Sequence, residues 1–173
     1  MDVGEGNNHQ FEMSKSLTKA LITVDGLVQH PIAQTDVVFK IANNKGASSS
    51  IFDFGLHSKI WPNVNYTKTI ELKSSKLTTM INDENIDIKK FQALLIDTQG
   101  SELLVLKGAS EILKNFDYII TEAADFESYV GGCKIEDLSI FLKTFGFNPI
   151  LKTKFAKHSG AGNYYDIIYK KSE

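Results

Sequence analysis

The sequence contains no arginine, because all 19 of the basic residues among its 173 are lysines. Without the guanidinium fork, a phosphate or carboxylate ligand would have to be held by lysines, backbone amides or hydroxyls. The lysines are opposed by 21 acids, which leaves a net charge of −2, and no basic block stands out. We therefore expect no nucleic-acid partner.

Cysteine is equally scarce, and Cys133 is its sole occurrence. An intramolecular disulfide and a multi-cysteine zinc module are therefore excluded. No window of the sequence approaches the roughly 18 uninterrupted apolar residues that a membrane-spanning helix needs. The first residues also lack the basic and apolar regions of a signal peptide. We expect a cytoplasmic protein with no membrane partner.

What is present is ordinary for a globular chain, with 42% hydrophobic and 23% charged residues. The length suits one core that buries about two thirds of the surface of the unfolded chain. We therefore treat residues 1–173 as a single domain.

Apolar runs and turn residues predict alternating strands and helices. The unbroken runs at 91–96 and 118–121 are typical of buried parallel strands. The strongest helical stripe covers 135–145 and ends at Gly146. We also expect helices over 14–21, 75–82 and 101–114, strands over 27–33, 37–41, 66–72, 147–151 and 164–169, and loops over 43–62 and 152–163. The alternation from residue 66 onward predicts an α/β fold whose sheet is mainly parallel, with an antiparallel pair at its C-terminal edge.

Two of these strands end in acids, Asp97 and Glu122. Because the carboxyl ends of parallel strands meet at the edge where ligands bind, we expect both acids there, close to Gln99 and Glu102. Such a group could act as a general base, orient a hydroxyl, or hold Mg²⁺ through oxygen ligands. The alternative is that each acid caps the next helix or pairs with a lysine.

Three further residues are candidates for the reaction site. Tyr129 lies in the loop after the second of these strands, where it could contact a substrate. Ser49 lies in a polar turn and could line a pocket, although a plain turn is the alternative. His158, expected in the loop before the last strand, could reach over the site as a base, although a lone loop histidine is usually solvated.

The stretch 94–109, Leu-Leu-Ile-Asp-Thr-Gln-Gly-Ser-Glu-Leu-Leu-Val-Leu-Lys-Gly-Ala, resembles the signature of FkbM-type methyltransferases. That signature is an apolar strand followed by Asp-x-Glu-Gly-x-Glu and a Leu-Lys-Gly-Ala helix. Asp97, Gly100, Glu102 and residues 106–109 match it, whereas Gln99 replaces the common acid. The resemblance extends over residues 27–170.

This resemblance implies a Rossmann-like, S-adenosylmethionine-dependent O-methyltransferase that acts on a hydroxyl of a small molecule, a sugar or a glycan. It implies catalytic roles for Asp97 and Glu122, with His158 as the other candidate base. The implied cofactor contacts are Glu12, Asp97 and Gln99, with Glu12 on the ribose, and the implied acceptor contacts are Ser49, Glu102 and Tyr129. Any Mg²⁺ would lie at Asp97 and Glu122.

The chain departs from the family at its start, where a glycine-rich turn should follow the first strand. Residues 2–7, Asp-Val-Gly-Glu-Gly-Asn, are similar to that turn, but no apolar strand precedes them. We expect residues 1–26 to form an incomplete cofactor-binding part in which the first βα unit is absent or shortened. A second copy, a partner chain or a rearrangement would then have to cover the exposed sheet edge. The alternative function is therefore a non-catalytic domain that binds a partner chain or a ligand.

Overall fold

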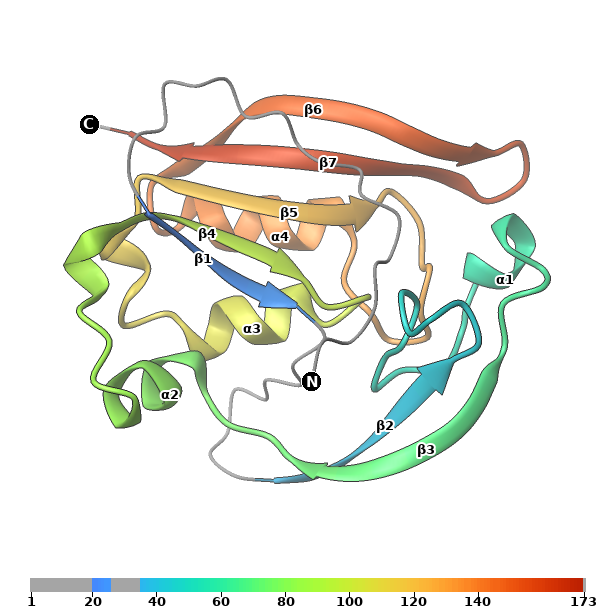
Figure 1. The fold of residues 1–173 in the computed structure, drawn as a ribbon. Coiled ribbons are helices and arrows are strands. Elements are labelled where there is room, and N and C mark those ends of the chain that lie inside the picture. Colours follow the sequence, from blue (N-terminus) through green and yellow to red (C-terminus); the bar gives the residue numbers. More distant parts are fainter. Residues whose placement is uncertain (1–19, 26–34, 173) are drawn as a thin grey trace.

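The structure, a computed structural model, describes residues 20–25 and 35–172 (Figure 1). In chain order the elements are β1 (Ala20–Asp25), β2 (Asp36–Ala42), α1 (His57–Ile60), β3 (Tyr66–Lys73), α2 (Leu77–Asp83), η1 (Ile88–Lys90), β4 (Phe91–Asp97), α3 (Glu102–Gly108), η2 (Leu113–Asn115), β5 (Tyr118–Ala124), α4 (Ile135–Lys143), β6 (Phe147–His158) and β7 (Gly162–Lys171).

The main sheet has five strands in the order β1-β4-β5-β7-β6. β4 pairs in parallel with β1 and β5, whereas β7 pairs antiparallel with both β5 and β6. The α/β class and the antiparallel C-terminal pair are thus confirmed. Of these five strands only β7 runs against the others, so the sheet is mixed in the expected way, with parallel β1, β4 and β5 and an antiparallel pair at the C-terminal edge.

Strand β1 occupies the edge of β4 that faces away from β5. Its register places Asp25 opposite Asp97, so both strands reach the same rim of the sheet. This edge of β4 is therefore paired within the chain, and the expected absence or shortening of the first βα unit stays a prediction. Of the helix expected over 14–21, Ala20 and Leu21 belong instead to β1, and the rest lies outside the described residues, as does the strand expected over 27–33.

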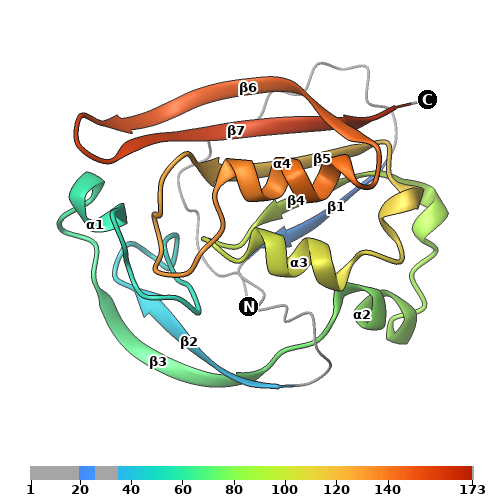
Figure 2. The ribbon, with the colours of Figure 1, turned by 180° about the vertical axis from the view of Figure 1, so that it is seen from behind.

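Helices α2, α3 and α4 lie on one face of the main sheet (Figure 2). The core between them joins Leu94 and Ile119 of the strands to Leu106 of α3 and Leu138 of α4, and all four are fully buried. Because side chains alternate along a strand, the residues between these core positions point to the opposite face. This alternation puts the acids of the candidate site on the sheet face opposite the helices.

The strand predicted over 66–72 is confirmed as β3, but it does not join the main sheet. It pairs antiparallel with β2 in a separate two-stranded sheet (Figure 1). After Tyr66, every residue of β3 is exposed, so neither face of this strand is buried. Thr, Lys and Glu alternate with too few apolar side chains to bury either face.

Two boundaries also differ from expectation. The helix expected over 101–114 ends at Gly108, where glycine weakens the helix and a turn leads into η2. The segment 152–163 is not a loop, because β6 and β7 continue through it to a tight hairpin. Its lysines, Lys152, Lys154 and Lys157, are exposed on an edge strand, where lysine is common. The loop predicted over 43–62 is confirmed except for the single turn of α1.

We expect Leu138→Ala to lower the free energy of unfolding by about 2–5 kcal/mol, because it leaves a cavity under α4. Ile140 of the same helix is 62% exposed. Ile140→Ala should therefore stay within about 0.5 kcal/mol of the parent chain. Urea unfolding measures both variants. Equal losses would contradict the packing of α4 described above.

Candidate functional site

Three acids on neighbouring strands share the sheet face opposite the helices. Asp97 ends β4 and Glu122 lies on β5, one residue beyond the paired Ile96 and Thr121. Glu122 in turn lies opposite Asp166 of β7. The expected meeting of Asp97 and Glu122 at the rim is therefore seen in the structure, and Asp166 is a neighbour that the sequence pattern did not indicate.

Of these three acids, Glu122 is the one whose negative charge is least stabilised by its surroundings. No described side chain or backbone group donates a hydrogen bond to its carboxyl. Its pKa is raised well above 4.5, first by burial and then by the negative charges of Asp97, Glu102 and Asp166. The folded chain therefore favours the protonated form of Glu122 more strongly than the unfolded chain does.

The turn after β4 holds Gln99 in the left-handed region, with φ of 51°, followed by Gly100 with φ of 99°. The Gln99 amide donates to Asp97 Oδ1 at 2.6 Å, and its Oε1 accepts the Tyr129 hydroxyl at 2.8 Å. The Ser50 hydroxyl donates to the Gln99 carbonyl at 2.7 Å. Gln99 thus links the end of β4 to two loops that are distant in sequence.

Glu102 is only 3% exposed and supports this turn from below. Its Oε1 accepts the backbone N–H groups of Thr98 at 3.1 Å and Gly100 at 3.0 Å, and its Oε2 accepts the Cys133 thiol at 3.2 Å. Burial raises the pKa of Glu102, and these hydrogen bonds partly offset the rise. The carboxylate faces the backbone of the turn, and its acceptor-binding role stays a prediction.

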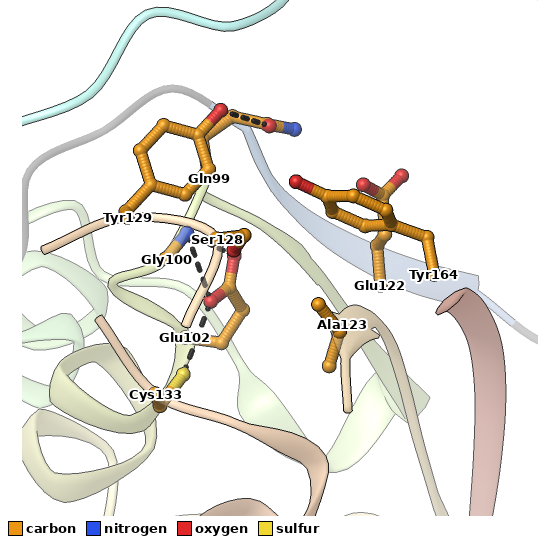
Figure 3. A pocket seen from close by; sticks show the side chains of 10 residues that line it. Gln99, Gly100, Glu102, Glu122, Ala123, Ser128, Tyr129, Cys133 and Tyr164 are labelled. Carbon is orange, nitrogen blue, oxygen red and sulfur yellow. Dashed lines mark hydrogen bonds between the residues drawn. The ribbon is translucent and has the colours of Figure 1, made fainter. Parts of the chain in front are cut away.

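Tyr129 and Tyr164 form the walls of a narrow cavity beside these acids (Figure 3). We call it the Glu122 slot; it is lined by Gln99, Gly100, Glu102, Glu122, Ala123, Ala124, Ser128, Tyr129, Cys133 and Tyr164. Its volume is about 10 Å³, which is room for one water molecule or one hydroxyl group. The arrangement can therefore bring a single hydroxyl next to a carboxyl group.

Behind Tyr164 lies His57, a residue that the sequence analysis did not single out. His57 is 2% exposed, and its Nδ1 shares a 2.8 Å hydrogen bond with the Tyr164 hydroxyl. Its ring stacks on Phe54 and lies against Trp61. Burial lowers the pKa of His57 to about 4, so the imidazole is neutral at pH 7. The feature of the sequence that could have drawn attention to His57 is the aromatic-rich segment around it.

The remaining predicted site residues lie apart from the slot or outside the described side chains. The Ser49 hydroxyl accepts the backbone N–H of Ala42 at 3.0 Å and does not line the slot. His158 is the last residue of β6, opposite Gly162, so its expected place in a loop is wrong. Glu12 lies outside the described residues. The functional roles assigned to these residues stay predictions.

Within residues 20–25 and 35–172, no group of three or more His, Cys, Asp or Glu side chains is arranged to hold a metal ion. None of the helices in the described segments is long and apolar enough to cross a membrane.

We expect Glu122→Gln to raise the free energy of unfolding at pH 8 and to flatten its dependence on pH. Because the folded state raises the pKa of Glu122, the parent chain loses stability as the pH rises from 4.5 through that raised pKa. The loss is about 1.4 kcal/mol for each pKa unit. Urea unfolding from pH 4.5 to 8 measures it, with the exposed Glu111→Gln as the matched control. Parallel curves for the parent chain and Glu122→Gln would contradict the burial of an uncompensated carboxyl.

We expect the His57 ring to titrate with a midpoint near pH 4 in the folded chain, below its ordinary 6.5. Because the unfolded chain then binds the proton more tightly, this group makes stability rise with pH between those two values. NMR of the imidazole signals measures the midpoint, and the His57→Gln variant assigns them. A midpoint near 6.5 would contradict the buried, neutral ring.

The comparisons with known proteins agree with this geometry. A family model described as the methyltransferase FkbM domain matches residues 7–149, which includes β4, β5 and the turn that carries Gln99. No curated protein and no solved structure matches the chain. Because the family match covers most of the sequence, the chain belongs to the FkbM methyltransferase family.

Proposed function

We propose that this protein is an S-adenosylmethionine-dependent O-methyltransferase that acts on a hydroxyl of a small molecule, with Glu122 as its general base. The observation that supports this most directly is the Glu122 carboxyl, which lines a slot the size of one hydroxyl and has no hydrogen-bond donor among the described residues. Glu122 is half-buried, its charged form is disfavoured by the acids around it, and acids perturbed in this way cluster at functional sites.

The raised pKa of Glu122 suits a proton acceptor. A general base is most effective when its pKa lies near the working pH, and burial beside three acids moves Glu122 in that direction. Asp97 is the weaker candidate, because its Oδ1 already accepts the Gln99 amide. In this proposal Glu122 takes the proton from the acceptor hydroxyl, and the Tyr129 and Tyr164 rings limit where that hydroxyl can lie.

The acids at the rim also suit the donor. A bound S-adenosylmethionine would supply the methyl group, and its sulfonium carries a positive charge that a row of carboxylates favours. Asp97 and Gln99 are the described residues that we assign to its binding, whereas the proposed ribose contact, Glu12, lies outside the described residues. We place the activity in the cytoplasm, and Asp97 and Glu122 are the residues whose oxygens would bind Mg²⁺ if the reaction uses it.

Calorimetric titration with S-adenosylhomocysteine tests the donor site, and methyl transfer to a panel of hydroxylated small molecules tests the reaction. We expect micromolar binding that Glu122→Gln preserves, together with a loss of methyl transfer of about 10²–10⁴-fold in that variant. Glu111→Gln is the matched control for both assays. Titrations with and without Mg²⁺ show whether the rim also binds the metal.

A folded chain that does not bind S-adenosylhomocysteine would contradict the proposal and favour a non-catalytic domain. Full methyl transfer by Glu122→Gln would instead support the methyltransferase activity and contradict the role of Glu122 as its general base.

A further inference from the structure

A buried histidine lies directly behind the wall of the Glu122 slot. His57 and Tyr164 are each 2% exposed, and the His57 Nδ1 atom lies 2.8 Å from the Tyr164 hydroxyl oxygen. Tyr164 in turn lines the slot together with Glu122 (Figure 3). These two residues project from the same face of the main sheet, because Tyr164 is paired with Ala124, two positions after Glu122. The hydrogen bond at His57 therefore acts on a residue of the slot.

The surroundings of the His57 ring indicate which of its nitrogens carries the proton. Its Nε2 atom is buried and has no hydrogen-bond partner among the described residues. A proton there would be a buried donor without an acceptor, whereas a proton on Nδ1 is donated to the Tyr164 oxygen. Among buried backbone groups, unpaired donors are rarer than unpaired acceptors, and we apply the same preference to this ring. The Nδ1–H tautomer is therefore favoured.

The tautomer of His57 determines what the Tyr164 hydroxyl can do. When His57 donates to the Tyr164 oxygen, the hydroxyl proton is not used on the histidine and can be donated to an oxygen atom in the slot. Burial raises the pKa of Tyr164, and a hydrogen bond with the Ser128 side chain, another residue of the slot, partly offsets the rise. The hydroxyl therefore keeps its proton at neutral pH, where it serves as a hydrogen-bond donor and not as a base.

We propose that the Tyr164 hydroxyl donates a hydrogen bond to the acceptor oxygen in the Glu122 slot, and that His57 is the residue that orients Tyr164. The inference rests on the proposed function and deepens it. The acceptor hydroxyl then donates to Glu122 and accepts from Tyr164, which leaves one lone pair of its oxygen for the methyl group. As that oxygen forms its bond to the methyl carbon, the carbon–sulfur bond breaks with its electron pair on sulfur, and the Glu122 carboxylate takes the proton.

Tyr164→Phe tests the hydrogen bond to the acceptor, because it removes the hydroxyl and keeps the ring. We expect kcat for methyl transfer to the panel of hydroxylated small molecules to fall by about tenfold or more, since the acceptor oxygen loses a contact that positions it. Binding of S-adenosylhomocysteine should be unchanged. Tyr165→Phe is the matched control, because the Tyr165 hydroxyl contacts Asp125 and not the slot. An unchanged kcat in Tyr164→Phe would overturn the inference while the proposed function stands.

Two replacements of His57 separate its hydrogen bond from its packing. His57→Asn retains an N–H donor near the position of Nδ1, whereas His57→Leu has a similar size and no donor. We expect His57→Leu to lower kcat by about fivefold or more, His57→Asn to keep most of the activity, and His57→Leu to cause no further loss when Tyr164→Phe is already present. Equal losses in His57→Asn and His57→Leu, or the same loss with and without Tyr164→Phe, would mean that His57 only packs against Phe54 and Trp61.

A measurement on the parent chain tests the arrangement without turnover and without any variant that has to fold. ¹⁵N NMR of the imidazole nitrogens at pH 7 distinguishes the two neutral tautomers, and we expect the His57 proton on Nδ1. A proton on Nε2 would make Tyr164 the donor to His57 and would overturn the inference even in an active enzyme. Circular dichroism establishes that each variant used for kinetics is folded. If the chain does not bind S-adenosylhomocysteine, the acceptor contact fails with the proposed function, and the Nδ1–H tautomer then supports only a structural hydrogen bond.

Discussion

The buried carboxylate of Glu102 is the interaction on which the candidate site depends. It accepts backbone N–H groups of the turn between β4 and α3 and, from the other side, the thiol of Cys133. These contacts fix a turn in which Gln99 and Gly100 both have positive φ. Because Gln99 then reaches Asp97 and Tyr129, one buried acid positions the rim acid, the slot wall and the loop before α4 together.

The same region carries the main electrostatic cost of the fold. Glu122 lies beside Asp97, Glu102 and Asp166, and no lysine within residues 35–172 forms an ion pair with it. The strand register imposes this arrangement, because paired positions on β4, β5 and β7 project from the same face of the sheet. The helices cover only the opposite face of the sheet, so the repulsion among these acids lies outside the apolar core. The feature that weakens the fold is thus the one that makes Glu122 a suitable proton acceptor.

Local patterns predicted β4, β5 and α4, each of which has apolar residues in the core, and they placed Asp97 and Glu122 at one rim. They did not predict that β3 pairs with β2 outside the main sheet, or that the β6–β7 pair extends through residues 152–163. The site was predicted at the strand ends and in the turn and loop that follow them, which include Gln99, Glu102 and Tyr129. The hydrogen bond between His57 and Tyr164 joins residues 107 positions apart, and no periodicity or spacing encodes such a contact.

Gln99 shows why a departure from the family pattern can preserve a site. The common acid at this position would place a second carboxylate within reach of Asp97, and like charges at that distance repel. An amide instead donates to Asp97 and at the same time accepts the hydroxyl of Tyr129, two contacts that a carboxylate could not make together. The substitution therefore removes one charge from a rim already rich in acids. It also connects that rim to the wall of the Glu122 slot, so in this chain the geometry of the slot follows from the residue that differs.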